Sequence, residues 1–189
     1  MSIVIGIDYS VNCPAVAALD TKTEKVQWHV NYRKIDGNPY PDLGKEVEWT
    51  RSTTTDELSR FIELSNWVTN IALCVIPNII VIEAYSFNAK GNITMLAENT
   101  GILKAALHEQ FPANPVHVVA PTSMKKFATG SGRADKDGIW AAFIKVFPQY
   151  AVWQSLCHPK AKKVGSPVAD IADSYFLAQY GRSFFLPAI

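Results

Sequence analysis

Short apolar runs alternate with longer amphipathic stretches along the chain, and this alternation predicts an α/β protein. The first run, residues 3–7, is rich in β-branched side chains and ends on Asp8, as expected for a buried central strand. A polar turn at 20–24 separates the next two runs, which indicates a hairpin. We expect five strands in all, at residues 3–7, 15–19, 25–35, 78–82 and 116–119.

Helical spacing of apolar residues, together with start and stop signals, predicts the helices. Thr54 and Glu57 have the spacing of a capping box, which indicates a helix that begins there and ends before Pro77. Ser166 and Pro167 suit the N-cap and the first position of the last helix. The other helices are expected at 93–111, from the capping residue Thr122 to 127, and at 139–146, and the last helix is expected to reach Tyr180.

The predicted order βββαβαβαα contains no internal repeat, and 189 residues correspond to about one domain. We therefore expect a single domain over residues 1–189, with an α/β fold in which helices flank a mixed five-stranded sheet. Residues 36–51 contain two prolines and two glycines and are expected to form a loop insertion. Residues 148–165 are expected to form a second one.

Composition excludes several classes of protein. Hydrophobic residues make up 48% and charged residues 19% of the chain, which excludes intrinsic disorder, collagen and a bare coiled coil. No apolar run approaches the roughly 20 residues that span a bilayer, and the sequence opens without the pattern of a signal peptide, so we expect a cytoplasmic protein. Three widely spaced cysteines without a C-x-x-C motif indicate neither a disulfide framework nor a structural zinc site.

Basic residues are concentrated in one part of the chain. Residues 121–165 hold eight Lys or Arg and two acids, a local net charge of +6, so the remainder carries −5 because the whole chain is +1. Such a segment fits a polyanion, although a solvated basic helix and loop give the same pattern. Trp140 and Trp153 lie in this segment and are candidates for stacking on bases.

Four acids carry the candidate chemistry. Asp8 and Glu83 each end a predicted strand, where open α/β sheets place their ligands, and Asp170 and Asp173 are three residues apart on one side of the last helix. If the four met about 5 Å apart, repulsion would be roughly 3 kcal/mol per pair at an effective dielectric near 20. They would then hold protons or bind hard divalent cations such as Mg²⁺ or Mn²⁺. Two such ions support phosphodiester hydrolysis, whereas each acid taken alone is more typical of a solvated side chain than of a catalytic one.

The sequence resembles the RuvC family of Holliday junction resolvases, which have a ribonuclease H-like fold, and it is most similar to the phage-encoded branch. The resemblance spans residues 3–181 and rests on four segments in order. These are Ile5-Gly6-Ile7-Asp8, Val81-Ile82-Glu83, Gly130-Ser131-Gly132-Arg133-Ala134-Asp135-Lys136 and Ala169-Asp170-Ile171-Ala172-Asp173.

The resemblance implies a magnesium-dependent, structure-selective endonuclease that acts on branched DNA such as four-way junctions. Asp8, Glu83, Asp170 and Asp173 would bind two Mg²⁺ ions, which Mn²⁺ can replace, and direct a water onto the scissile phosphate to leave a 5′-phosphate and a 3′-hydroxyl. Lys136 matches the family's basic residue near the site and is counted with the catalytic group. No nucleotide cofactor is implied, and a phage-encoded protein would act in the cytoplasm of its bacterial host.

The resemblance also implies DNA contacts and an assembly. Lys125 and Lys126 fall where the family carries DNA-contacting lysines, and Arg133 lies in the same basic segment as Lys136. The family works as a homodimer that nicks two strands symmetrically, and the predicted helix around Gly101 is then a candidate interface.

The sequence departs from the bacterial family at its aromatic wedge. That position is Ser86 here, flanked by Tyr85 and Phe87, and either aromatic can be expected to stack on bases at the crossover or to pack in the core. Lys90, in the same stretch, is a further candidate DNA contact.

Two other functions stay open on the sequence alone. One is a ribonuclease of the same fold that cleaves RNA–DNA hybrids, which would require recognition of 2′-hydroxyls. The other is a non-catalytic module that binds branched DNA. Acids at all four positions disfavour the second, because a pure binder gains affinity by losing carboxylates near phosphate.

Overall fold

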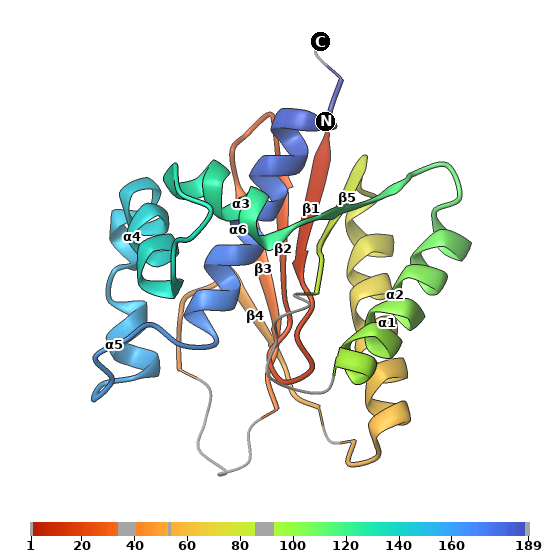
Figure 1. Ribbon diagram of the computed structural model, residues 1–189, viewed down its shortest axis with the longest axis horizontal. Coiled ribbons are helices and arrows are strands. Elements are labelled where there is room, and N and C mark those ends of the chain that lie inside the picture. Colours follow the sequence, from red (N-terminus) through yellow and green to blue (C-terminus); the bar gives the residue numbers. More distant parts are fainter. Residues whose placement is uncertain (1, 34–40, 53, 86–92, 188–189) are drawn as a thin grey trace.

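A computed structural model of the chain describes residues 2–33, 41–52, 54–85 and 93–187, and it forms one six-stranded mixed sheet with helices on both faces (Figure 1). The strand order is β4-β3-β2-β1-β5-β6. The strands are β1 (Ile3–Asp8), β2 (Ala15–Asp20), β3 (Val26–Asn31), β4 (Val47–Thr50), β5 (Ile79–Glu83) and β6 (Val116–Val119). The helices are α1 (Glu57–Val75), α2 (Ile93–Gln110), α3 (Pro121–Thr129), α4 (Lys136–Val146), the 3₁₀ turn η1 (Pro148–Tyr150), α5 (Trp153–Cys157) and α6 (Val168–Phe184).

The register of the central strands brings two of the acids to one edge of the sheet. Strand β1 runs antiparallel to β2 and parallel to β5, and Ile7 pairs with Ile82. The next residue on each strand is an acid, so Asp8 and Glu83 end neighbouring parallel strands side by side. This is the edge at which parallel strands of α/β folds present their functional side chains.

Each face of the sheet has its own hydrophobic core. Helices α1 and α2 cover one face, and α6, together with α3, α4 and α5, covers the other (Figure 1). On the α6 face, Trp28 of β3 makes edge-to-face contacts with four aromatic rings, those of Phe143, Phe147, Tyr150 and Trp153. Trp153 and Trp140 are both buried, so the prediction that they stack on bases is wrong.

Helix α6 packs directly onto the backbone of the central strands because glycine removes the side chain between them. A Cβ atom built on Gly6 of β1 would overlap the carbonyl oxygen of Ser174 and the amide nitrogen of Ala178. Near the other end of the helix, a Cβ on Gly181 would lie 3.0 Å from Cγ1 of Val4 and closer still to Val81. The close approach fixes the height of α6 above the sheet and so the position of the acids in its first turns.

The two predicted loop insertions both contain regular structure. Within residues 36–51, β4 pairs in parallel with β3, which makes six strands rather than the expected five. A four-residue strand in which Val47 is buried and Glu48 is exposed is too short to give a clear period in the sequence. Within 148–165, η1 and α5 bring Trp153 into the core.

Three predicted helix caps are wrong. Helix α1 is capped by Asp56, whose side chain accepts a hydrogen bond from the Ser59 amide at 2.8 Å, while Thr54 donates its hydroxyl to Glu63 instead. Helix α3 begins two residues earlier than a cap at Thr122 would place it, with Ala120 at the N-cap. Helix α6 begins at Val168, after Pro167 rather than after Ser166, and runs to Phe184, four residues past the predicted end.

No helix in the described part of the chain combines the length and the apolar character that crossing a bilayer requires. The three cysteines are free thiols.

Candidate active site

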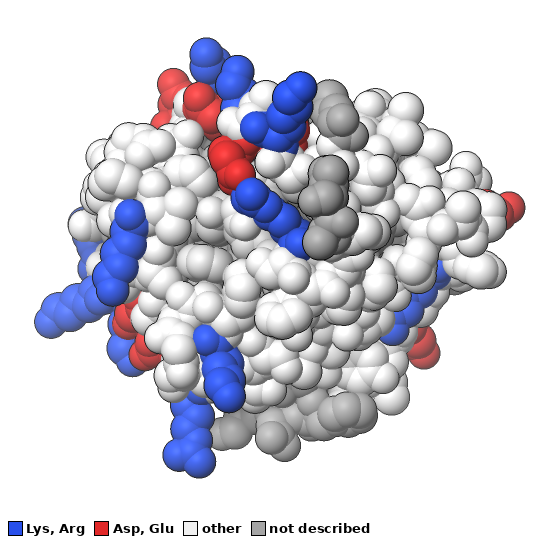
Figure 2. All heavy atoms as spheres, turned by 90° about the horizontal axis from the view of Figure 1, so that it is seen from above, with Lys and Arg blue, Asp and Glu red and all other residues white. Residues whose placement is uncertain are grey.

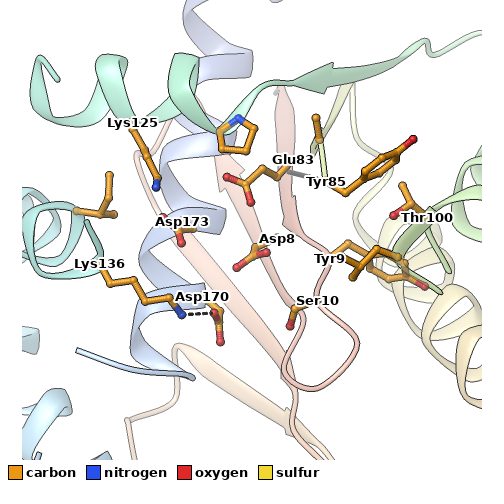
Figure 3. A pocket seen from close by; sticks show the side chains of 14 residues that line it. Asp8, Tyr9, Ser10, Glu83, Tyr85, Thr100, Lys125, Lys136, Asp170 and Asp173 are labelled. Atoms are coloured by element: carbon orange, nitrogen blue, oxygen red, sulfur yellow. Dashed lines mark ion pairs between the residues drawn. The ribbon is translucent and has the colours of Figure 1, made fainter. Parts of the chain in front are cut away.

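The four acids singled out by the sequence meet in one cavity of about 330 Å³ at the carboxyl ends of β1 and β5 (Figure 3). Asp8 comes from β1, Glu83 from β5, and Asp170 and Asp173 from the first two turns of α6. The cavity is lined by Asp8, Tyr9, Ser10, Glu83, Ala84, Tyr85, Leu96, Thr100, Pro121, Lys125, Lys136, Ile139, Asp170 and Asp173.

Burial and nearby charges raise the pKa values of these carboxyl groups. Burial, followed by the charges of Asp170 and Glu83, raises the pKa of Asp8 well above its usual range. Burial and the charge of Asp173 raise the pKa of Glu83 to about 8, and burial and the charge of Asp170 raise the pKa of Asp173 to about 7. Burial also raises the pKa of Asp170. A site that penalises its own negative charge in this way favours the entry of cations.

Two lysines reach into the same cavity from α3 and α4 (Figure 3). Nζ of Lys136 lies 3.7 Å from Oδ1 of Asp170. The positive charges of Lys125 and Lys136 both lower the pKa values of Glu83 and Asp173 and so oppose the effect of burial. The cavity therefore contains four acids and two ammonium groups.

The donor set fits a hard divalent cation. Oδ2 of Asp170 and Oδ1 of Asp173 are buried and have no hydrogen-bond partner within the described residues, so each has lone pairs free for a ligand. Among the same residues, no three His, Cys, Asp or Glu side chains form a group that could hold a metal ion as they stand. Binding of an ion by three or more of these carboxylates would thus require them to draw together.

Comparison with known proteins rests on three-dimensional structure. The sequence matches no family model and no curated protein. Thermus thermophilus RuvC superimposes with a TM-score of 0.59 at 14% identity, over 96% of this chain and 95% of that one. T. thermophilus RuvC in complex with Holliday junction substrate gives 0.62 at 16%, over 97% and 96%. The yeast mitochondrial Holliday junction resolvase Ydc2 gives 0.54 at 18%, over 94% and 76%.

The chain has the RuvC fold. The expected ribonuclease H-like α/β fold is thereby confirmed, with six strands in place of five. The resemblance spans residues 3–181, from β1 to α6. The superpositions on the two Thermus structures cover nearly the whole chain and so include both of these elements.

Of the other predicted DNA contacts, one lines the cavity, two lie outside it and two lie outside the described residues. Lys126 and Arg133 are exposed and do not line the cavity. Tyr85 lines it and is half-buried. Phe87 and Lys90 lie outside the described residues, so their predicted roles remain predictions.

Sequence reasoning missed several residues of the cavity wall. Tyr9 and Ser10 follow Asp8 directly, and Thr100 faces them from α2 (Figure 3). The buried thiol of Cys13 lies beside Asp170, and its pKa is raised by burial and by the charge of that acid. The adjacency of Tyr9 and Ser10 to a strand-end acid was the available signal, whereas Thr100 is identified only by how the helices pack.

A buried arginine holds the loop that carries Tyr9 and Ser10. Arg60 of α1 is 1% exposed and donates hydrogen bonds to the carbonyl oxygen of Val11 at 3.1 Å and to Oδ1 of Asn31 at 3.1 Å. Its charge is balanced by Glu63, 3.4 Å away. The loop after β1 is thus tied to α1 and to the end of β3, although Arg60 itself does not line the cavity.

Proposed function

We propose that this protein is a metal-dependent endonuclease that resolves four-way junctions and related branched DNA. The observation that carries the proposal is the meeting of Asp8, Glu83, Asp170 and Asp173 in one cavity on the RuvC fold. The superimposed Thermus protein was solved in complex with a Holliday junction substrate, which supports the same class of substrate here. Such a substrate also fits the expected cytoplasmic location.

The four carboxylates would hold two Mg²⁺ ions, which Mn²⁺ can replace. When bound, the ions supply an activated water and neutralise charge on the phosphate as its P–O bond breaks. The chain's own contribution is to hold the carboxylates on rigid elements, β1, β5 and α6, in a buried setting. The unpartnered oxygens of Asp170 and Asp173 are the ones we assign to the ions first.

Lys136 and Lys125 would orient the scissile phosphate. Both line the cavity from one side, and an ammonium group binds phosphate as a point charge. Tyr85 lines the opposite side and is the described candidate for stacking on a base at the crossover. Lys126 and Arg133 are exposed and lie close in sequence to Lys125 and Lys136, respectively. They would extend the contact along the phosphate backbone of the DNA.

Two copies of the chain are needed to cut two strands symmetrically, and we place the contact between them on α1 and α2. A groove of about 350 Å³ lies between these helices and is lined by Leu58, Phe61, Gly101, Ile102, Glu57 and Glu98. Leu58 is 58% exposed there, and a Cβ atom added to Gly101 would have nothing within 4 Å, so the groove is open at this glycine. Burial of this apolar groove would stabilise a dimer.

Light scattering tests the dimer. We expect a mass of twice 20.9 kDa for the wild type and a monomer for Leu58→Asp. Leu73→Asp is the matched control, because Leu73 is a similarly exposed leucine of α1 that does not line the groove. A monomeric wild type at micromolar concentration would contradict the assignment.

Cleavage of labelled substrates tests the proposed function. A four-way junction, a linear duplex and an RNA–DNA hybrid are incubated with Mg²⁺ or with chelator, using the wild type and Asp170→Asn. We expect paired symmetrical nicks in the junction only, with Mg²⁺ only and with the wild type only. Cleavage of the hybrid in preference to the junction would indicate a ribonuclease, and tight junction binding without cleavage in either metal would indicate a binding module.

A further inference from the structure

The segment between α5 and α6, residues 158–167, is called here the lysine loop. It carries Lys160, Lys162 and Lys163, and all three are exposed. None of the three forms an ion pair with another described residue. Three positive charges in four residues without an acidic partner repel one another, so the segment gains from an external anion.

The backbone of the lysine loop is nevertheless held in place. The Val164 amide donates a hydrogen bond to Oδ1 of Asp137 on α4 at 2.7 Å, and Nε2 of Gln154 on α5 donates to the carbonyl oxygen of Lys163 at 3.0 Å. Within the loop, Nε2 of His158 lies 2.6 Å from the carbonyl oxygen of Ser166. These contacts hold the backbone that carries the lysines, which lowers the backbone entropy lost when the lysine loop binds a ligand.

The anchoring points connect the lysine loop to the candidate active site. Asp137, which holds Val164, follows Lys136, and Lys136 lines the cavity. At its other end the loop leads directly into α6, whose first turn carries Asp170. The backbone of the lysine loop therefore contacts the first turn of α4 and leads into the first turn of α6, and both turns carry residues that line the cavity.

The opposite end of the sheet has a different charge pattern. Lys22, Lys25 and Lys45 lie there, near the turn between β2 and β3. Lys25 and Lys45 line a surface hollow whose wall also includes the acids Asp20, Glu24 and Glu46. Seen from the end that carries the termini, basic and acidic side chains are mixed around the rim of the molecule (Figure 2). Acids thus lie among the lysines at that end of the sheet, whereas residues 158–167 contain no Asp or Glu and the three lysines of the lysine loop form no ion pair with a described residue.

We propose that the lysine loop binds the phosphate backbone of a DNA duplex arm that leaves the active site, through Lys160, Lys162 and Lys163. This inference rests on the proposed function, because it takes the scissile phosphate to be in the cavity. Lysines contact phosphates without reading sequence, so the loop would position an arm and add affinity without selecting a cleavage site. A segment fixed at both ends can also set the direction of that arm relative to the metal-binding acids.

The salt dependence of binding tests this inference. Affinity for a four-way junction is measured by fluorescence anisotropy from 50 to 200 mM salt, with Ca²⁺ in place of Mg²⁺ to prevent cleavage, for the wild type and for Lys160→Ala/Lys162→Ala/Lys163→Ala. Each lost phosphate contact lowers the slope of log K against log salt by about 0.9, so we expect a decrease of about 2 to 3. The matched control is Lys22→Ala/Lys25→Ala/Lys45→Ala, which removes the same charge and should keep the wild-type slope to within about half a unit.

The outcomes separate this inference from the proposed function. If the wild type binds and cuts junctions but the lysine-loop variant has the same slope as the control variant, the inference is overturned and the proposed function stands. A wild type that binds no junction overturns both. Because the three lysine side chains are exposed, the variant should keep the wild-type Tm, and single-turnover cleavage at saturating DNA should stay within about twofold of the wild type, since the cavity is unchanged.

Discussion

Nζ of Lys136 lies 3.7 Å from Oδ1 of Asp170, and the two side chains differ sharply in burial, at 54% and 6% exposed. An ammonium that is half in solvent thus faces a carboxylate that is almost fully enclosed. Together with Lys125, Lys136 supplies two positive charges against four acids, and the pKa values of all four acids remain raised. The cavity therefore has fewer positive groups than acids, and removal of an acid or addition of a cation should reduce this imbalance.

Asp170→Asn and Asp8→Asn should each abolish cleavage of a junction while leaving junction binding in Ca²⁺ within a few fold of the wild type. Each substitution removes an oxygen that we propose binds metal and also relieves repulsion, so the Tm of the metal-free protein should rise by roughly 3 °C for each kcal/mol of repulsion removed. Gel-based cleavage and thermal melts in chelator measure the two effects. Glu109→Gln on the exposed side of α2 is the control and should change neither.

The metal-free protein should become less stable as the pH rises. The pKa values of Glu83 and Asp173 are about 8 and about 7 in the folded chain, against about 4 in the unfolded chain, so the folded state binds more protons between these limits. Stability from these groups is present below about pH 4 and is lost as the pH rises toward 8. Thermal melts in chelator from pH 5.5 to 8.5 should show a falling Tm.

Mg²⁺ should restore the Tm most strongly at pH 8.5, because it binds the ionised carboxylates of the folded state only. Glu83→Gln should reduce the fall of Tm with pH in chelator. A Tm that is constant or rises over this range would show that the acids are solvated and do not repel one another.

Gly6→Ala should destabilise the protein by about 3 kcal/mol or more, because the added methyl group meets the backbone of α6 rather than a side chain that can move. Gly101→Ala on α2 is the matched control. Its Cβ would have nothing within 4 Å, and alanine is the better helix former by about 1 kcal/mol, so that variant should be as stable as the wild type or more so. Urea denaturation of both variants decides the comparison, and equal midpoints would mean that α6 can lift from β1 at little cost.

Arg60→Met should cost about 3 to 5 kcal/mol, since it leaves the carbonyl oxygen of Val11, Oδ1 of Asn31 and Oε1 of the partly buried Glu63 without the donor that Arg60 supplies. The loop that carries Tyr9 and Ser10 would lose its tie to α1. Proteolysis of the folded protein and urea denaturation measure the two effects. Arg51→Met, at an exposed arginine, is the control and should be close to neutral.

The sequence singled out the four acids that line the cavity, because each strand-end acid follows a clear apolar run. Asp8 and Glu83 could be placed at strand ends, and the three-residue spacing of Asp170 and Asp173 placed both on one side of a helix. That β1 and β5 are neighbours was not visible in the pattern and came only with the resemblance to RuvC. The structure supplies the register that sets the two acids side by side.

Features that depend on contacts between distant segments could not be predicted. Arg60 reaches a carbonyl 49 residues earlier in the chain and a side chain 29 residues earlier, and nothing local to α1 announces either partner. Trp153 was misassigned because its position in a basic segment does not reveal whether the side chain is exposed. It is buried against Trp28. The fourth strand was missed because its pairing with β3, rather than its own sequence, makes it a strand.

The close packing of α6 against the central strands depends on positions that have no side chain. Gly6 lies in β1 beneath α6, and Gly181 lies in α6 itself, where it faces Val4 and Val81. Neither glycine lines the cavity. A saturation screen for cleavage should nonetheless find both positions as intolerant of replacement as the acids. Positions that tolerate no substitution would then be of two kinds. At some, the side chain takes part in the reaction; at others, a glycine allows the close packing that holds those side chains in position.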